Sequence, residues 1–381
     1  MSKCYIVNGL VYTEHQFKPM TVVVEGGKLS LLDPDNVLED GDCFDATGMK
    51  VVPGFIDTHT HGAVGVDVNG ALAEDLETIS QFFAANGTTA WLASVLTDTQ
   101  EQTEWCIAQM HAHEVLEQAG AELMGIHLEG PFLAKEYKGA MPEHLLQTNN
   151  LSLVDHYQQL ANGKIRYITI APELPGAIEM IPGLKKLGIV VGIGHSGATY
   201  QQTMEAIEAG ATVGTHMGNA MRLLHQHEPA VFGAVIESDA YAEVICDGRH
   251  LHPGTVRLLL KAKGADRLVA ITDSIMAAGL PDGNYHLGVN DVVVEDGDAK
   301  LASNGTRAGS TLTQNVALKN LLQYTGLPLE RILPLLTENP AREMGFEDRK
   351  GYIANGMDAD LVLLDEENNV AHVFARGKQV K

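Results

Sequence analysis

Short apolar segments with the composition of β-strands alternate with amphipathic segments through the middle of this chain. The apolar segments are rich in β-branched residues, and the segments between them place apolar residues at helical spacing. Eight such alternations predict a parallel sheet whose strands are connected by helices, and the number eight favours an α/β fold of the (β/α)8 TIM barrel type. A doubly wound open sheet has the same alternation, so counting segments does not exclude it. The strand-like segments are residues 51–57, 88–95, 123–128, 167–171, 189–194, 212–215, 242–246 and 268–272.

Both ends of the chain contain short strand-like segments separated by turns. Near the N-terminus, residues 21–25 are followed by Gly26-Gly27, which is a hairpin signal. Similar segments occupy roughly the last 30 residues, and neither end has enough strands for a core of its own. We therefore predict a small β-sandwich domain formed by residues 1–50 and 350–381, and a barrel domain formed by residues 51–349.

The charge balance of the chain excludes some classes of partner. The 381 residues include 26 Lys and Arg against 49 Asp and Glu, a formal net charge of −23. Nucleic acids and anionic membranes attract basic surfaces, so we expect neither as a partner. No apolar run approaches the roughly 18 residues of a membrane span, and the four cysteines form no C-x-x-C pair. These features are typical of a cytoplasmic protein with reduced thiols and a large core.

Titratable residues directly follow seven of the eight strand-like segments. In a (β/α)8 barrel the reactive side chains come from the C-terminal ends of the strands, so these residues are expected to meet at one rim. The segments that carry them are Asp57–Gly62, His127–Pro131, Ala171–Glu173, Gly194–Ser196, Thr215–Asn219, Asp247–His250 and Thr272–Ser274.

Five of these residues are the types that bind a divalent metal. His59 and His61 are two positions apart on an extended segment, so their side chains share one face; an ordinary loop pair is the alternative. Glu129 lies in an apolar segment and needs a partner, either a metal or a buried ion pair. His195 and His216 alone would be core histidines, but at successive strand ends they add to the same ligand set. Such nitrogen and oxygen donors suit Zn²⁺, Fe²⁺, Mn²⁺ or Co²⁺, one or two per chain.

Asp273, after the last strand-like segment, is the best candidate for a general base. It can take a proton from a metal-activated water and return it to a leaving group. The alternative is that it caps a helix over residues 274–278. Asn219-Ala220, the loop 247–250 and residues 305–312 are weaker candidates for a substrate pocket, since ordinary loops have the same composition.

The motifs at the strand ends resemble those of the amidohydrolase superfamily and, within it, the N-acetylglucosamine-6-phosphate deacetylases. Pro53–Gly62 alone indicates only the superfamily, whereas His127–Pro131 combined with His216–Met221 is more specific to the deacetylases. The resemblance covers essentially the whole chain. It implies removal of acetate from N-acetylglucosamine 6-phosphate to give glucosamine 6-phosphate, in amino-sugar catabolism.

The resemblance also implies roles for individual residues. Glu129, His195 and His216 would bind the main metal, and His59 and His61 a second one bridged by Glu129. Asp273 would carry the proton from the attacking water to the departing nitrogen. The substrate would contact Ala140, Asn219, Ala220, His227, His250, Ala308 and Gly309.

Two departures from the family pattern concern substrate recognition. After Lys138-Gly139-Ala140 many members have a histidine where this chain has Met141, and before Glu228-Pro229 they often have an arginine where it has His227. N-Acetylgalactosamine 6-phosphate, or another N-acyl substrate, therefore stays an alternative. In this family a neighbouring subunit completes the phosphate pocket, so a homodimer is expected. A cyclic amidase is a further alternative within the superfamily. Such enzymes with two metals usually need a carbamylated lysine that bridges the metals, and this chain has Glu173 instead of a lysine at the end of the fourth strand, which argues against that alternative.

Overall fold

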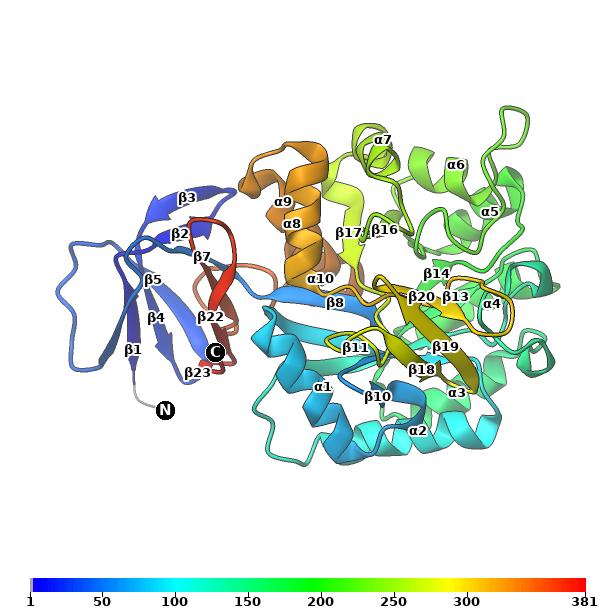
Figure 1. Ribbon diagram of the computed structural model, residues 1–381, viewed down its shortest axis with the longest axis horizontal. Helices are drawn as coiled ribbons and strands as arrows, with labels where there is room; N and C mark the ends of the chain where they lie inside the picture. Colours follow the sequence, from blue (N-terminus) through cyan, green and yellow to red (C-terminus); the bar gives the residue numbers. More distant parts are fainter. Residues whose placement is uncertain (1–2) are drawn as a thin grey trace.

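A near-closed barrel of eight parallel strands forms the larger part of the protein (Figure 1). The computed structural model describes residues 3–381. Neighbouring strands pair in the order in which they follow one another along the chain, which confirms the predicted (β/α)8 barrel over an open doubly wound sheet. The strands are β8 (Phe55–Thr60), β11 (Thr88–Leu96), β12 (Glu122–Glu129), β13 (Ile165–Ile170), β14 (Val190–Ile193), β15 (Val213–Gly214), β16 (Tyr241–Ile245) and β17 (Leu268–Ile271).

The first and last strands meet through the segments at their C-terminal ends. The backbone N–H of Asp273 donates to the carbonyl of His59 at 2.9 Å, and the N–H of His61 donates to the carbonyl of Ser274 at 2.7 Å. These two hydrogen bonds bring β8, which carries two predicted metal ligands, beside the segment that carries the predicted general base. The closure of the barrel therefore helps to build the candidate site.

Helices connect the strands and cover the outside of the barrel (Figure 1). Several begin at a residue whose side chain accepts a hydrogen bond from the first turn: Thr199 accepts from Gln202 N–H, and the Gln202 side chain accepts in return from Thr199. The helices are α1 (Ala73–Ala85), α2 (Gln100–His113), α3 (Leu151–Leu160), α4 (Ala177–Lys186), α5 (Tyr200–Ala209), α6 (Ala230–Glu237), α7 (Pro253–Lys263), α8 (Gln314–Thr325), α9 (Leu329–Leu336) and α10 (Glu338–Met344).

The first predicted barrel strand, residues 51–57, is divided between two sheets. Its beginning belongs to β7 (Lys50–Pro53) of the small β region, and the barrel strand β8 starts only at Phe55. Gly54 separates them in a crowded place, because a Cβ at this position would lie 2.0 Å from Thr89 Oγ1. The apolar run is continuous because both strands are buried, so composition did not indicate the break.

Strands from both ends of the chain build the small β region, where the first and last segments lie side by side (Figure 1). The C-terminal strand β21 pairs with β7 on one side and with β22 on the other. The Gly26-Gly27 hairpin is confirmed between β4 and β5. The division into domains at residues 50 and 350 stays a prediction. The strands are β1 (Cys4–Val7), β2 (Leu10–Thr13), β3 (Gln16–Pro19), β4 (Thr21–Glu25), β5 (Lys28–Leu32), β6 (Asp42–Asp45), β21 (Leu361–Leu364), β22 (Val370–Ala375) and β23 (Lys378–Gln379).

A buried ion cluster links the barrel to the small β region. Lys350, only 2% exposed, lies 2.6 Å from Glu122 Oε2 and 3.1 Å from Asp358 Oδ2, and it also contacts Asp360. Arg349 reaches Glu122 and Asp358 as well. Glu122 begins barrel strand β12, whereas the two aspartates precede β21. The cluster therefore fixes the last part of the chain against the barrel.

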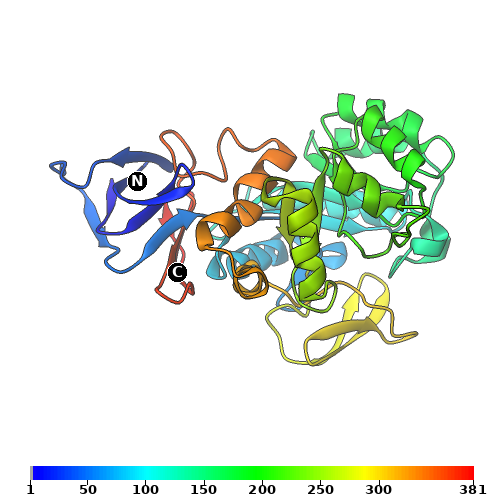
Figure 2. The same cartoon turned by 90° about the horizontal axis from the view of Figure 1, so that it is seen from above.

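A three-stranded antiparallel sheet is inserted between β17 and α8, and the sequence analysis did not predict it. It consists of β18 (Gly283–Leu287), β19 (Asn290–Glu295) and β20 (Asp298–Leu301). Figure 2 shows this sheet as a yellow layer at one edge of the barrel. Its buried side chains, among them Leu287 and Val292, pack with Leu96 and Met141. In residues 3–381 no helix is long and apolar enough to cross a membrane.

Candidate active site

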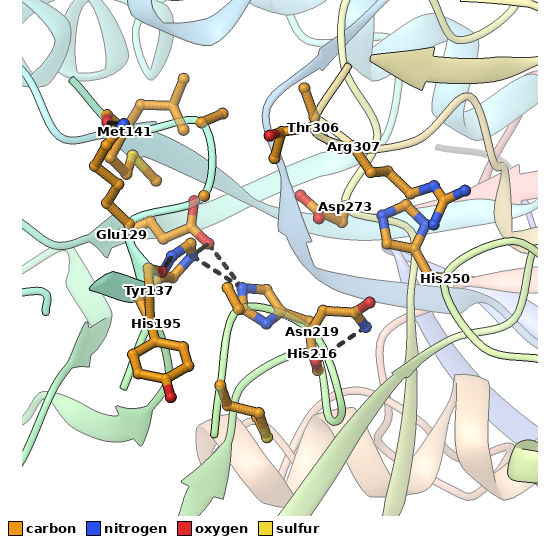
Figure 3. A pocket seen from close by; sticks show the side chains of 18 of the residues that line it. Glu129, Tyr137, Met141, His195, His216, Asn219, His250, Asp273, Thr306 and Arg307 are labelled. Carbon is orange, nitrogen blue, oxygen red and sulfur yellow. Dashed lines mark hydrogen bonds and ion pairs between the residues drawn. The ribbon is translucent and has the colours of Figure 1, made fainter. Parts of the chain in front are cut away.

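Glu129, His195 and His216 converge at the C-terminal rim of the barrel. Glu129 ends β12, and the two histidines follow β14 and β15. Glu129 Oε1 lies 3.0 Å from His195 Nε2 and 3.1 Å from His216 Nε2, and the two nitrogens are 3.1 Å apart. Figure 3 shows the three side chains pointing toward one another. All three are buried, with 3–5% of their surface exposed.

The two histidines of β8 approach the same carboxylate from another side. His59 Nε2 lies 3.3 Å from Glu129 Oε1, and His61 Nε2 lies 3.2 Å from Glu129 Oε2. Asp273 Oδ1 is 3.2 Å from His61 Nε2 and 3.7 Å from His59 Nε2. Two His/Glu triads capable of holding a metal therefore share Glu129, and Asp273 stands beside the triad that contains His59 and His61.

Three of the four histidines have their Nδ1 atoms turned toward groups that only accept hydrogen bonds. His61 Nδ1 lies 3.1 Å from the Ser94 carbonyl, and His195 Nδ1 lies 2.8 Å from the Tyr137 carbonyl. His59 Nδ1 lies 3.4 Å from Glu243 Oε2. In a neutral imidazole that donates through Nδ1, Nε2 carries a lone pair. The Nε2 lone pairs of these histidines then face Glu129, and within residues 3–381 His59 Nε2 has no hydrogen-bond partner.

This donor set fits divalent cations. Lone pairs and a carboxylate this close would repel one another unless a positive charge lay between them. Donors bound at about 2.0–2.1 Å to one tetrahedral Zn²⁺ lie about 3.3 Å apart, close to the separations observed here. Imidazole and carboxylate also suit Fe²⁺, Mn²⁺ and Co²⁺, so the donors do not select among the four metals.

The electrostatics of the site favour bound positive charge. Burial raises the pKa of Glu129, but the neighbouring histidines outweigh burial and hold this pKa well below its ordinary range. Burial lowers the pKa of His61, yet Asp273 and Glu129 raise it to about 9 overall. The position of His61 Nε2 beside the two carboxylates thus favours a positive charge, which either a proton on the ring or a metal ion supplies. Burial also raises the pKa of Asp273. The hydrogen bond between Asp273 and His61 and the charge of His59 outweigh burial, so the pKa of Asp273 lies below its ordinary value. The carboxylates are thus held ionised, ready for a cation.

Left-handed backbone conformations aim several of these side chains. His195, His216 and Asp273 have φ values of 48°, 31° and 50°. Such values are unfavourable for residues with a Cβ and occur where surrounding structure enforces them, most often at functional sites. Asp273 is not a helix cap, because residues 274–278 form no helix. The sharp turn after each strand instead directs the side chain toward the barrel axis.

A cavity of about 550 Å³ opens above the two triads. Six of the seven predicted substrate-binding residues line it, and His250 is held there by a 2.7 Å contact between its Nδ1 and Asp247 Oδ2. His227 is exposed and does not line the cavity. His59 lies beneath it, with no exposed surface. The six lining residues are Ala140, Asn219, Ala220, His250, Ala308 and Gly309.

Several residues besides the predicted ligands and substrate contacts also line the site, and one of them, Met141, was noted above as a departure from the family pattern. Lys138 and Arg307 line the cavity and supply positive charge. Leu96, Met141 and Leu287 form an apolar part of its wall. Lys138 and Met141 belong to the Lys138–Met141 segment noted for its family resemblance, whereas Arg307 follows the unpredicted β18–β20 sheet. Arg307 nevertheless lies within residues 305–312, the segment expected above as a weaker candidate for the substrate pocket.

Comparison with known proteins places the chain in a family. The amidohydrolase family model matches residues 50–380. The chain belongs to the amidohydrolase family. It is 36% identical over 348 residues to the N-acetylglucosamine-6-phosphate deacetylase of Lysinibacillus sphaericus, covering 91% of this chain and 89% of the relative. It is 33% identical over 327 residues to an N-acetylgalactosamine-6-phosphate deacetylase of Escherichia coli O157:H7, covering 86% of each.

Solved structures of this amidohydrolase family agree with the whole architecture. A mutant N-acetyl-D-glucosamine-6-phosphate deacetylase from Mycobacterium smegmatis, solved in complex with N-acetyl-D-glucosamine-6-phosphate, superposes with a TM-score of 0.93 and 32% sequence identity. The match covers 100% of both chains. It includes the small β region as well as the barrel.

Proposed function

We propose that this protein is a metal-dependent N-acetylglucosamine-6-phosphate deacetylase. It hydrolyses the amide of N-acetylglucosamine 6-phosphate and yields glucosamine 6-phosphate and acetate. The observation that carries the proposal is the pair of His/Glu triads sharing Glu129 beneath the cavity. The full-length similarity to deacetylases of amino-sugar phosphates supports the substrate class.

Glu129, His195 and His216 would hold the main metal in this proposal, and His59 and His61 together with Glu129 would hold a second one. A divalent metal bound there would supply a Lewis acid that activates water and polarises the amide carbonyl. The protein excludes bulk water around these groups, because all five ligands are buried. Hydrogen bonds to the backbone carbonyls of Ser94 and Tyr137 also hold His61 and His195 in place.

Asp273 moves the proton. Its carboxylate is ionised and lies beside His61 at the floor of the cavity, within reach of a water and a substrate amide held there. It accepts the proton of the attacking water and passes it to the amide nitrogen, which leaves as the amine while the carbonyl carbon leaves as acetate. One water is consumed for each amide bond that is broken.

Lys138 and Arg307 provide the positive charge for the phosphate end of the substrate. A chain of net charge −23 needs local cations to bind a phosphate ester. Lys138 has no carboxylate partner within the described residues and donates only to the Met141 carbonyl. Arg307 pairs with Asp298 through Nε and Nη2, which leaves Nη1 free to face the cavity. His250, Asn219 and the backbone of Ala220, Ala308 and Gly309 contact the sugar.

A homodimer is the quaternary structure that we propose. The exposed loop that carries His227 also exposes Leu223 by 76% and Leu224 by 53%, so it is suited to contact a second copy of the chain. His227 would then act in the cavity of the partner, which is consistent with its absence from the cavity of its own chain. A cytoplasmic location stays part of the same proposal.

A substrate panel tests the function. The purified protein is assayed with N-acetylglucosamine 6-phosphate, N-acetylgalactosamine 6-phosphate and unphosphorylated N-acetylglucosamine, and metals are measured in the same preparation. The first substrate is expected to give the highest kcat/KM and the unphosphorylated sugar the lowest. A preference for the galactosamine epimer would favour the alternative that the Escherichia coli relative suggests. Release of acetate from none of the three would refute the proposal.

A further inference from the structure

Glu243 is a buried carboxylate in an otherwise apolar strand, and the mechanism above assigns it no chemistry. It lies in β16 with no exposed surface, and it has no Lys or Arg partner within residues 3–381. An ionised group in such a place is costly unless hydrogen bonds or positive charge compensate it. Its contacts are therefore informative about its role.

One oxygen of Glu243 contacts a ligand residue of each metal triad. Oε2 lies 3.4 Å from His59 Nδ1, and it accepts a hydrogen bond from the backbone N–H of His216 at 3.2 Å. The Nδ1 of His216 has no hydrogen-bond partner among the described residues. His216 is therefore held through its backbone N–H, whereas His59, His61 and His195 are held through their rings. The same backbone turn is in the left-handed conformation, with φ of 31°.

Glu243 differs from the groups behind the other ligands in its charge. His61 and His195 face the neutral carbonyls of Ser94 and Tyr137, whereas His59 faces a carboxylate. A carboxylate behind a metal-bound imidazole fixes the tautomer and makes the ligand nitrogen more basic. We propose that Glu243 is a positioning residue that holds His59 as the Nδ1–H tautomer and couples the position of His59 to that of His216. The inference rests on the proposed metal-dependent function and deepens it.

Glu343 offers a matched control within the same layer of the protein. It is 4% exposed and accepts a hydrogen bond from Thr58 at 3.2 Å, with no hydrogen bond to a histidine. Both residues are glutamates buried beneath β8, the strand that carries His59. Replacing either of them therefore has the general cost of removing a buried carboxyl group. Only Glu243 contacts residues of the two triads.

The test measures metal binding in the holoenzyme, using Zn²⁺ as the probe in competition with a chelator. Glu243→Ala is expected to weaken binding of at least one Zn²⁺ by about 10- to 100-fold. Glu243→Gln keeps a carbonyl oxygen for both contacts and is expected to lose less, while Glu343→Gln binds as the unaltered protein does. Equal affinities of Glu243→Ala and the unaltered protein would overturn the proposal, and so would an equal loss in Glu343→Gln.

A measurement on the unaltered protein covers the case in which Glu243 variants do not fold. Neutron diffraction from crystals of the Zn²⁺-loaded protein locates the exchangeable hydrogen of His59. A deuteron on Nδ1 directed at Glu243 supports the proposal, and a bare Nδ1 or a deuteron on Nε2 overturns it. Failure to deacetylate any sugar phosphate would refute the proposed function without altering either result, because neither experiment measures turnover.

Discussion

The Nε2 atoms of His195 and His216 lie 3.1 Å apart, and both lie within 3.1 Å of the same oxygen of Glu129. Glu129 is ionised and a neutral His195 has only a lone pair at Nε2, because its Nδ1 faces the Tyr137 carbonyl, so neither group has a hydrogen to donate to the other. A cation among the three atoms satisfies all of them. Replacing any one of these side chains should then change the amount of metal that the protein binds.

Replacing His195 should remove bound metal. His195→Ala takes away one of three donors of the main triad, and we expect the metal bound per chain to fall by about one equivalent after dialysis. Elemental analysis of the purified variant measures this. His144→Ala, at an exposed histidine that does not line the cavity, serves as the control and should keep its metal. Unchanged stoichiometry in His195→Ala would exclude it as a ligand.

Replacing Asp273 should separate turnover from metal binding. Asp273→Asn keeps an oxygen next to His61 but loses the basic carboxylate, so kcat should drop by about 10²- to 10⁴-fold. Steady-state assays measure the loss, and elemental analysis of the same sample should find the metal content unaltered. Full turnover in this variant would remove Asp273 from the mechanism.

Replacing the cavity cations should affect only the phosphorylated sugar. Lys138→Gln and Arg307→Gln each remove a charge that a phosphate would contact, a loss of about 1.5–3 kcal/mol that lowers kcat/KM by roughly 10- to 100-fold. The rate with unphosphorylated N-acetylglucosamine should stay the same. Lys164→Gln, which removes a lysine paired with Glu114 outside the cavity, should alter neither rate. Equal losses on both sugars would contradict a phosphate-binding role.

Replacing Lys350 should destabilise the protein strongly. Lys350→Met leaves the buried Asp358 and Asp360 and the partly buried Glu122 around an uncharged side chain, at a cost of about 3–5 kcal/mol in the free energy of unfolding. Lys28→Met removes a half-exposed partner of Asp358 and should cost about 1 kcal/mol or less, since Arg349 and Lys350 remain. Urea unfolding of both variants measures the difference. Similar costs for the two lysines would contradict the role of the buried cluster.

Acid should weaken the same ion cluster. Burial raises the pKa of Asp358, but Lys28, Lys350 and Arg349 outweigh it and lower the pKa to about 2 from an ordinary 3.8. A lowered pKa in the folded protein means stability that is present above about pH 4 and lost as the pH falls toward 2, about 2 kcal/mol in total. Asp358→Asn should flatten this part of the stability curve, measured by unfolding at several pH values. Asp35→Asn, at an exposed aspartate, should leave the slope as it is.

The barrel and the residues of the two His/Glu triads could be predicted because their pattern is local in sequence. A parallel strand buried on both faces is a continuous apolar run, and the residue just after it must point to the rim. The apolar runs directly before Glu129 and His195 were therefore enough to predict that both residues lie at the rim. Glu243 carried a signal too, as the one charged residue in the run 242–246, but nothing nearby in sequence showed that it faces His59.

Other parts depended on contacts between distant segments. The sheet β18–β20 has short strands with few alternations, and its packing against Leu96 and Met141 is formed only in the folded protein. Ala140 and Ala308 have no reactive group, so only family resemblance indicated them as cavity residues. The position of His227 is set by the conformation of an exposed loop, which residue type does not fix.

The pairing of β21 with β7 has a consequence for biosynthesis. The sheet that starts near the N-terminus lacks its central neighbour until residues 361–364 have left the ribosome, long after the barrel segments have emerged. Until that moment the apolar edge of β7 is open to pairing with other chains. A premature stop codon shortly before β21 would therefore leave both His/Glu triads and Asp273 in the chain, yet still produce a protein prone to aggregate.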